Sequence, residues 1–361
     1  MAAGPRRLDP TPARVWDASA CAGAEVLTPA QVASWREKGF CLVDGVLDAQ
    51  LLSEARDQLE QAAEEHVKYD FGGVEFPAQK AQALNRVAIS ERMAMAVAQL
   101  LECSPYDLRL YQSSAWVKHA QPRNHERKAR DNFDQRMHMD YPNHTLTHPP
   151  PWNKPSAVEL IVYYDDCEEC GGHTAVVPRE GDADPCYAWP YLMPGVTGYE
   201  PCPTYVNDRE HAESLIASAS EEASQFRKLL YEREVRAWYR RGTILFYRHD
   251  TWHRGTPLRD GARRRFAHNL VIGLPNVPGL CAWNAGTARH MYAEDHFVEN
   301  LVIHASPLQR SLLGFPQPGD ASWTQLTIDA VKRRYGNIDM APYEAAMHAE
   351  QRRTKARRTA A

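Results

Sequence analysis

A β-strand with two unlike faces is predicted by the stretch Arg265-Phe266-Ala267-His268-Asn269-Leu270-Val271-Ile272. Successive side chains of a strand point to opposite sides of its sheet. The mixed side of this strand carries Arg265, Ala267, Asn269 and Val271. The apolar side carries Phe266, Leu270 and Ile272. We therefore expect the mixed side to face the interior of a barrel and the apolar side to pack against helices.

Four further segments have the same short, β-rich character, and they cover residues 108–118, 157–164, 174–177 and 242–247. Turn signals separate them, notably Cys170-Gly171-Gly172 and Arg259-Asp260-Gly261. Short strands divided by such turns indicate an antiparallel barrel or sandwich, because alternating βαβ units would need helices between them. The sequence thus predicts a mainly β core.

The helices expected to flank this core lie early in the chain. Thr28 and Gln31 have the spacing of a capping box around Pro29, which predicts a short helix that ends at Gly39. A strand is expected at residues 40–47. Helices are expected at residues 48–67 and 90–101, the second with Ser90 as its N-cap. Residues 1–27 lack periodicity, so we expect a flexible segment there and ordered structure from Thr28 onward.

Composition excludes several classes of function. The 361-residue chain has a formal net charge of -4, which gives no overall attraction to nucleic acid or to anionic membranes. No window approaches the ~20 apolar residues that span a bilayer, and Met1 to Arg14 lacks the apolar core of a signal peptide. The eight cysteines are scattered, which favours free thiols. We expect a cytoplasmic protein with a small-molecule substrate, and a solvated basic tail at residues 352–358.

Two short segments predict a metal site. In His138-Met139-Asp140, placed on a strand, the imidazole and the carboxylate would share one face. A distant histidine, His253 in Trp252-His253-Arg254-Gly255-Thr256-Pro257, would complete the set. Two histidines and one carboxylate at adjacent corners of an octahedron suit non-haem Fe(II) and leave positions for a cosubstrate and dioxygen. This favours an oxygenase.

Other polar residues receive bland interpretations. His249 precedes His253 by four residues, but it follows a strand directly, so we expect a structural neighbour and not a zinc ligand on a helix. Glu159, Asp165 and Asp166 are assigned to a strand and its solvated end, without a catalytic role. His119, His125, His144, His148 and His173 are kept as possible neighbours of the site. The single CxxC, Cys167 to Cys170, is expected at the end of a hairpin, because a zinc ribbon would need a second pair.

The motifs together resemble the phytanoyl-CoA dioxygenase family of Fe(II)- and 2-oxoglutarate-dependent oxygenases. The resemblance is carried in order by Leu27 to Gln31, Tyr111 to Lys118, His138 to Asp140, Gly171 to Pro178, Gly242 to Phe246 and His253 to Pro257. It implies a double-stranded β-helix (a jelly-roll, cupin-like fold) with flanking helices. It also implies that His138, Asp140 and His253 bind Fe(II), with 2-oxoglutarate and O2 as cosubstrates. A carboxylate at Asp140 favours hydroxylation over halogenation.

The resemblance further implies an arginine, on the strand after His253, that holds the far carboxylate of 2-oxoglutarate. Three arginines compete at residues 263–265; the usual spacing favours Arg264, and strand alternation favours Arg265. We prefer Arg265 and keep Arg264. Gln112 and Lys118 would share one face of their strand, where either could contact cosubstrate or substrate, although a solvated rim position for Lys118 is equally consistent.

We therefore expect three parts: a flexible segment at residues 1–27, an oxygenase domain at residues 28–280, and a C-terminal helical extension with a basic tail at residues 281–361. An insertion at about residues 181–241, with Tyr187, Trp189, Tyr191 and Tyr199, is expected to form a lid over a partly apolar substrate. An acyl-CoA, an amino-acid derivative and a natural-product scaffold all remain open, as do desaturation, ring closure and the oligomeric state. The alternative function is a non-catalytic metal- or small-acid-binding β-barrel.

Overall fold

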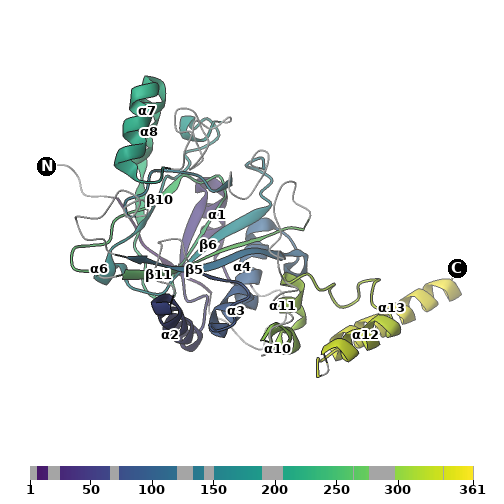
Figure 1. Cartoon of the computed structure of the whole chain (residues 1–361). Helices are drawn as coiled ribbons and strands as arrows, with labels where there is room; N and C mark the ends of the chain where they lie inside the picture. The colour runs from purple at the N-terminus through teal and green to yellow at the C-terminus, as the bar shows by residue number, and fades with distance from the viewer. Residues whose placement is uncertain are drawn as a thin grey trace.

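The computed structural model describes residues 6–14, 25–65, 73–119, 133–141, 150–188, 206–262, 264–275, 297–335 and 337–360. Two mixed β-sheets form the centre of this structure (Figure 1). The larger has the strand order β2 (Thr11–Pro12), β3 (Phe40–Asp44), β9 (Ile244–Tyr247), β6 (Ala157–Tyr163), β11 (Arg264–Gly273), β5 (Arg109–His119) and β4 (Val74–Glu75). The smaller has the order β1 (Arg6–Leu8), β8 (Val235–Ala237), β7 (Thr174–Val176) and β10 (His253–Gly255).

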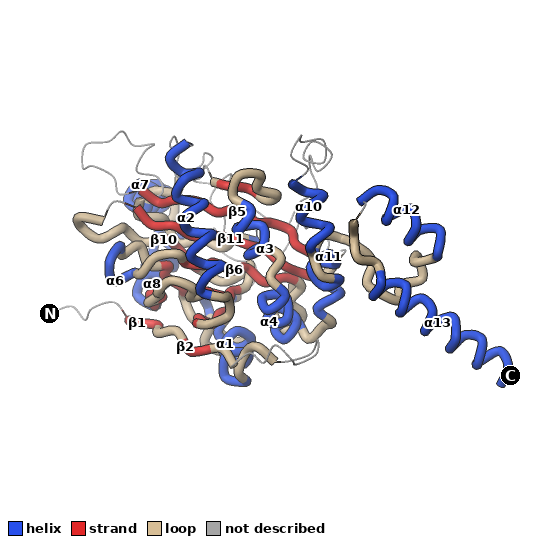
Figure 2. Tube along the Cα trace, turned by 90° about the horizontal axis from the view of Figure 1, so that it is seen from below, coloured by secondary structure: helices blue, strands red, loops and turns tan. Residues whose placement is uncertain are grey.

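Helices cover one face of the larger sheet. Figure 2 shows α2 (Ala49–Glu65), α3 (Gln82–Ala88) and α4 (Glu91–Leu101) lying over β5, β11 and β6. Phe266, Leu270 and Ile272 are buried in the hydrophobic core shared with these helices. Ala267, on the opposite side of β11, is buried in a separate cluster between the sheets. The two predicted faces of this strand are therefore confirmed.

Helix α1 (Pro29–Lys38) begins and ends where the sequence predicts. The Thr28 side chain and Gln31 form the capping box, and Pro29 occupies the first turn. Gly39 ends the helix with φ 97°, a conformation that costs a residue with a Cβ more than glycine. The Gly39 carbonyl oxygen then accepts hydrogen bonds from the Arg248 amide (3.0 Å) and the Thr251 hydroxyl (2.9 Å). This helix end thus supports the loop that leads to His253.

Regular structure begins earlier than predicted. Strand β1 pairs in parallel with β8, and β2 pairs in parallel with β3, so the expectation of a flexible lead-in is wrong for these two strands. Strands of three and two residues are too short to produce a periodic pattern. They form because the edges of both sheets offer unpaired backbone groups.

The insertion contains helices as well as loops. Its described part contains a short 3-10 turn, η3 (Pro185–Tyr187), and a hairpin of α7 (Arg209–Ala219) and α8 (Glu221–Arg233). Ser220 ends α7 and caps α8. The chain then enters the smaller sheet as β8. Tyr187 is buried against Trp152, whereas Trp189, Tyr191 and Tyr199 lie outside the described residues. The lid remains a prediction.

The remaining helices are short or lie at the C-terminal end. Cys167–Cys170 forms one helical turn, α6, with both thiols buried and free, and η1 (Pro105–Asp107) precedes β5. The others are α10 (Phe297–His304), α11 (Pro307–Leu312), α12 (Gln325–Tyr335) and α13 (Ala341–Ala360). The last two extend away from the two sheets in Figure 1. The boundary predicted at residue 280 falls in a segment that the structure does not describe.

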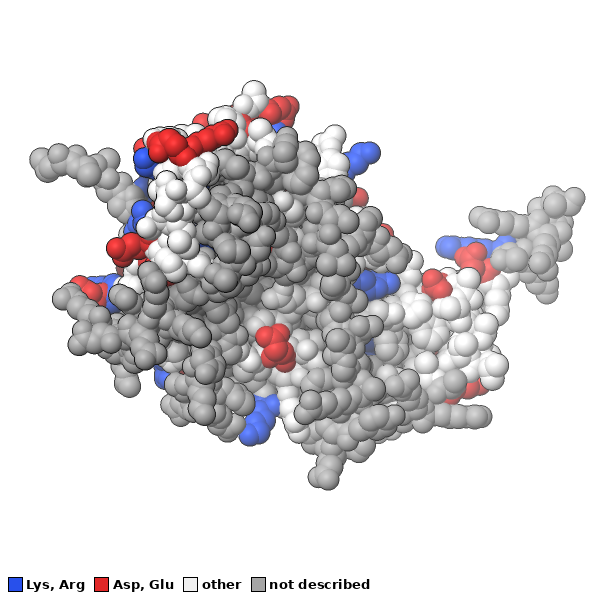
Figure 3. All heavy atoms as spheres, turned by 45° about the horizontal axis from the view of Figure 1, so that its top comes forward, with Lys and Arg blue, Asp and Glu red and all other residues white. Residues whose placement is uncertain are grey.

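A separate hydrophobic cluster packs the C-terminal helices with α10, and it contains Trp323, Ile328 and Tyr343 beside Val302. Buried Arg310 adds hydrogen bonds between its parts, because the Arg310 guanidinium donates to the carbonyl oxygens of Val302, Ile303 and Asp339. On the face drawn in Figure 3, acidic and basic side chains of the described residues are interspersed. Among the described helices, none has the length and apolarity to cross a membrane.

Candidate metal centre

The segment 133–141 carries two of the predicted ligands beside β10. His138 forms an isolated antiparallel bridge with His253, through His138 N–H to His253 O (2.9 Å) and the reverse bond (2.8 Å). We predicted that His138 lies on a strand, but the structure gives it only this isolated bridge. The expected alternation of side chains nevertheless holds. Met137 and Met139 are buried in an apolar cluster with Trp252, and His138 and Asp140 point the other way. Trp252 is fully buried in this cluster.

The three predicted ligands converge on one point. The Nε2 atom of His253 lies 3.2 Å from Oδ2 of Asp140, and the Nε2 atom of His138 lies 3.7 Å from Oδ1. One ligand atom from each residue lies within 4.8 Å of the others, and no further such group of His, Cys, Asp or Glu occurs in the described part of the chain. Metal bonds of about 2.1 Å at right angles separate neighbouring ligand atoms by about 3 Å. The spacing therefore fits a metal ion.

Backbone carbonyls set the tautomer of both histidines. The Nδ1–H of His138 donates to the Arg136 carbonyl oxygen (3.0 Å), and the Nδ1–H of His253 donates to that of Thr251 (3.0 Å). A carbonyl oxygen only accepts, so each Nε2 keeps its lone pair and faces Asp140. The Tyr247 hydroxyl donates to Oδ2 of Asp140 (2.9 Å) and orients the carboxylate. These partners orient the ligands as metal sites require.

The electrostatics of the triad also fit a cation. Burial, and next the neighbouring His253, lower the pKa of His138 to about 3, so this imidazole is neutral, as metal binding requires. Burial acts to lower the pKa of His253, but Asp140 outweighs it and raises this pKa. The Asp140 carboxylate thus favours positive charge next to His253, as it would favour a bound metal cation.

Inward side chains of the larger sheet form rows that lead away from this point. The row that contacts Asp140 contains Tyr247, Glu159, Val271 and Gln112. The next contains Leu245, Ile161, Asn269 and Ser114, and the third contains Tyr163, Ala267 and Trp116. The last contains Arg265 and Lys118. The metal ligands and Arg265 therefore lie toward opposite ends of one interior.

Arg265 is placed to bind an anion. Its side chain is 3% exposed and its guanidinium lies over the rings of Trp116 (5.3 Å) and Tyr163 (5.9 Å). One nitrogen donates to the Gly172 carbonyl oxygen (2.7 Å), whereas the buried Nε atom has no hydrogen-bond partner among the described residues. A buried donor without a hydrogen-bond partner destabilises the folded protein, so the Arg265 guanidinium is suited to binding the carboxylate of a small acid.

The neighbouring candidates lie in different environments. Arg264 points to the outer side, where it pairs with Glu60 of α2 and lies over Phe266, and Arg263 lies outside the described residues. Lys118 is buried, and its ammonium group donates to the Thr256 carbonyl oxygen (2.7 Å), so the solvated rim position is wrong. Gln112 is half-buried on the inner face. Contacts of these residues with a cosubstrate stay predictions.

Sequence reasoning missed a buried polar pair beside the site. The prediction that Glu159 is solvated is wrong. This residue is 3% exposed, and its carboxylate lies 3.2 Å from Nδ1 of His249. Burial, and next the nearby Asp140, raise the pKa of Glu159. The His249 carbonyl oxygen accepts from the amides of Asp140 (3.1 Å) and Tyr141 (2.9 Å). An acidic residue inside an otherwise apolar strand was the available signal.

Among the described residues, the other acidic and histidine candidates do not belong to the group that converges on Asp140. Asp165 pairs with Arg56 of α2, and Asp166 accepts from the Arg241 amide. His173 donates through Nδ1 to the Ala237 carbonyl oxygen (2.8 Å) and lies against Trp238. His119 ends β5 and is half-buried, whereas His125, His144 and His148 lie outside the described residues.

Comparison with known families identifies the class. The family model described as phytanoyl-CoA dioxygenase (PhyH) matches residues 35–266, which is more than half of the chain. The protein therefore belongs to the phytanoyl-CoA dioxygenase family, as the sequence motifs predict. None of the curated proteins compared with the chain matches it significantly.

Solved structures resemble the chain in fold. One is the non-heme alpha-ketoglutarate-dependent carbocyclase SnoK of nogalamycin biosynthesis, with 15% identity, a TM-score of 0.50, and coverage of 73% of this chain and 90% of that one. Others are HygX from Streptomyces hygroscopicus with iron bound (17% identity, TM-score 0.44, coverage 73% and 94%) and the epimerase SnoN with Fe3+, alpha ketoglutarate and nogalamycin RO (17% identity, TM-score 0.43, coverage 68% and 82%). The similarity to SnoK is one of fold.

Proposed function

We propose that the protein is an Fe(II)- and 2-oxoglutarate-dependent dioxygenase that hydroxylates a small molecule, on a double-stranded β-helix core. The observation that carries this proposal is the convergence of His138, Asp140 and His253 at one end of an interior that has Arg265 at the other. Iron and 2-oxoglutarate, when bound, would supply the activation of dioxygen and its reduction, with succinate and CO2 as products.

The residues of the chain would divide the work. The two Nε2 lone pairs and the Asp140 carboxylate would hold the metal, with Tyr247 orienting the carboxylate. Arg265 would bind the far carboxylate of 2-oxoglutarate as a planar fork, with its orphaned Nε atom as one donor. Trp116 and Tyr163 would hold that guanidinium in position and exclude water from it.

The substrate would lie over the β5 side of the interior. There Gln112, Ser114 and Asn269 are half-buried, whereas inward residues of the central strands, such as Ile161 and Leu245, are buried. The Oδ1 atom of Asn269 has no hydrogen-bond partner among the residues that the structure describes. It would accept from a hydroxyl or amino group of the substrate. This supports a polar small molecule over an acyl chain.

The test is succinate release by Fe(II)-loaded protein given 2-oxoglutarate and air, compared with His138→Ala and Asp140→Ala. Succinate formed by the parent and lost in both variants supports the dioxygenase. Iron and 2-oxoglutarate binding without succinate, across a panel of polar substrates, would favour the alternative, a non-catalytic metal- or small-acid-binding β-barrel. Absence of iron binding would refute the dioxygenase and the metal-binding form of the alternative.

A further inference from the structure

Met137, one position before His138, connects the segment that carries the metal ligands to the helical hairpin of α7 and α8. Both of its backbone polar groups are bound by side chains of α8. Its amide donates to the Tyr231 hydroxyl (3.0 Å), and its carbonyl oxygen accepts from Nη2 of Arg227 (2.8 Å). A short extended segment with only isolated bridges has few backbone partners of its own, so these two bonds fix its position.

A carboxylate of the other helix holds both side chains. Nε of Arg227 lies 2.7 Å from each oxygen of Glu213 in α7, and the Tyr231 hydroxyl donates to the same carboxylate (2.6 Å). Arg227 is 1% exposed. The three side chains therefore form one network, in which Tyr231 accepts from Met137 while donating to Glu213, and Arg227 donates through Nε to Glu213 and through Nη2 to Met137.

The chain on either side of Met137 is tied to the same hairpin. The Arg136 amide donates to the Asn207 carbonyl oxygen (2.8 Å), and the Arg209 amide at the start of α7 donates to that of Asp134 (2.9 Å). The Arg136 carbonyl oxygen is the acceptor for Nδ1 of His138. A displacement of the hairpin would therefore move both the main chain and the acceptor that orients the His138 ring.

We propose that Glu213, Arg227 and Tyr231 are positioning residues that hold Met137 and thereby aim His138 and Asp140 at the metal. The proposal rests on the proposed function for the identity of the metal. It gives the inserted hairpin a role that differs from that of a lid, because the hairpin contacts the main chain at Met137 and not the substrate. No residue of the network would touch substrate or cosubstrate.

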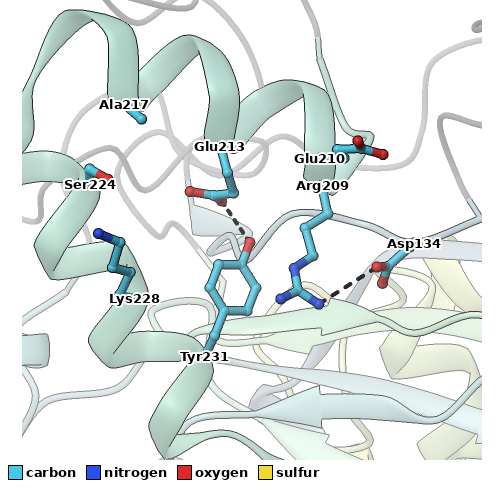
Figure 4. Close-up of a pocket in the computed structure, with 8 residues that line it drawn as sticks. All are labelled: Asp134, Arg209, Glu210, Glu213, Ala217, Ser224, Lys228 and Tyr231. Carbon is cyan, nitrogen blue, oxygen red and sulfur yellow. Dashed lines mark hydrogen bonds and ion pairs between the residues drawn. The ribbon is translucent and has the colours of Figure 1, made fainter.

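The network can be changed without opening the core. Figure 4 shows Tyr231 and Glu213 facing each other between α7 and α8, on the wall of a surface pocket of about 540 Å³. Tyr231→Phe removes one oxygen and keeps the ring. It leaves the Met137 amide without its acceptor and Arg227 with its carboxylate. Removal of a residue that orients the metal ligands typically lowers the metal affinity of a site about 10–100-fold.

The test uses Co(II) as a spectroscopic substitute for the metal, with hydrogen exchange of residues 133–141 as a second readout in metal-free protein. The matched control is Tyr164→Phe, a buried tyrosine whose hydroxyl contacts His268 on the far side of the sheet. We expect Tyr231→Phe to weaken Co(II) binding about 10-fold or more, to change the Co(II) visible spectrum and to speed exchange, and Tyr164→Phe to change none of these. Glu213→Gln, which keeps a partner for Tyr231, should fall between.

Two results would overturn the proposal: Co(II) affinity, spectrum and exchange unchanged in Tyr231→Phe, or equal losses in both tyrosine variants. If the parent protein binds no Co(II), the proposed function fails. The exchange data then decide separately whether the hairpin holds Met137, and unchanged exchange in Tyr231→Phe overturns that as well.

Discussion

At the scale of single residues, two adjacent arginines have opposite fates. Arg265 lies inside beside two aromatic rings, and Arg264 pairs with Glu60 outside. We predict that Arg265→Lys weakens 2-oxoglutarate binding about 10–100-fold, because a lysine keeps the charge but loses the planar fork, and that Arg264→Lys leaves binding unchanged. Titration calorimetry of the metal-loaded protein checks both. Equal losses in the two variants would contradict the assignment of Arg265 as the residue that binds the far carboxylate.

A second residue-scale prediction concerns stability and pH. His268 is fully buried, its ring nitrogens contact the hydroxyls of Ser113 and Tyr164, and burial lowers its pKa from 6.5 to about 3. Below pH 6.5 the unfolded chain takes up a proton that the folded protein does not, so the free energy of unfolding falls as the pH falls. This loss should amount to about 1.4 kcal/mol between pH 7.5 and 5.5.

The substitution His268→Gln keeps hydrogen-bonding capacity and removes the titration. In urea unfolding we expect this variant to lose stability with falling pH by about 1.4 kcal/mol less than the parent over the same interval. His304→Gln, at an exposed histidine of α10, serves as the control and should follow the parent. A parent-like slope in His268→Gln would show that other groups cause the pH dependence.

At the scale of elements, the end of α1 is connected to the metal centre. A Cβ at Gly39 would lie 2.6 Å from Oγ1 of Thr251, whose carbonyl oxygen orients His253. Gly45 has a similar positive φ but nothing within 4 Å of its Cβ position. We predict that Gly45→Ala costs about 1–2 kcal/mol of unfolding free energy, and that Gly39→Ala costs a further 1–3 kcal/mol, roughly, and also weakens Co(II) binding.

Urea unfolding and Co(II) titration of the two glycine variants separate backbone strain from the collision. Strain alone would affect both proteins alike and would leave the metal affinity of each unchanged. An equal loss of stability in the two variants would contradict a supporting role for the end of α1.

The elements that sequence predicts well are those whose signal is local. The capping box at Thr28 and the alternation from Arg265 to Ile272 specify one helix start and two strand faces without reference to the rest of the chain. Even the ligand triad has a local part, because the spacing of His138 and Asp140 places both on one side. What cannot be seen is set by distant partners: β1 exists because β8 has a free edge, and Glu159 is buried because His249 faces it.

At the scale of the whole molecule, the C-terminal helices pack with α10 in a cluster apart from the main core, and Arg310 adds hydrogen bonds between its parts. We predict that Arg310→Met, which leaves three carbonyl oxygens without a donor, makes α12 and α13 markedly easier to cleave with a protease specific for aromatic residues. Co(II) affinity should stay unchanged, because this cluster is apart from the main core. Arg353→Met, at a side chain 73% exposed, is the control. Weaker Co(II) binding in Arg310→Met would instead mean that the cluster supports the barrel.

The parallel pairing of β1 with β8 has a consequence for how the protein is made. Arg6–Leu8 leaves the ribosome well before its partner Val235–Ala237, which follows only after most strands of the larger sheet have been synthesised. Likewise His138 must wait for His253 before its bridge can close. Because chains emerge at about 5–20 residues per second, the smaller sheet has open edges for many seconds. Newly made chains are therefore most exposed to aggregation, and most dependent on chaperones, just before β10, the last strand of the smaller sheet, leaves the ribosome.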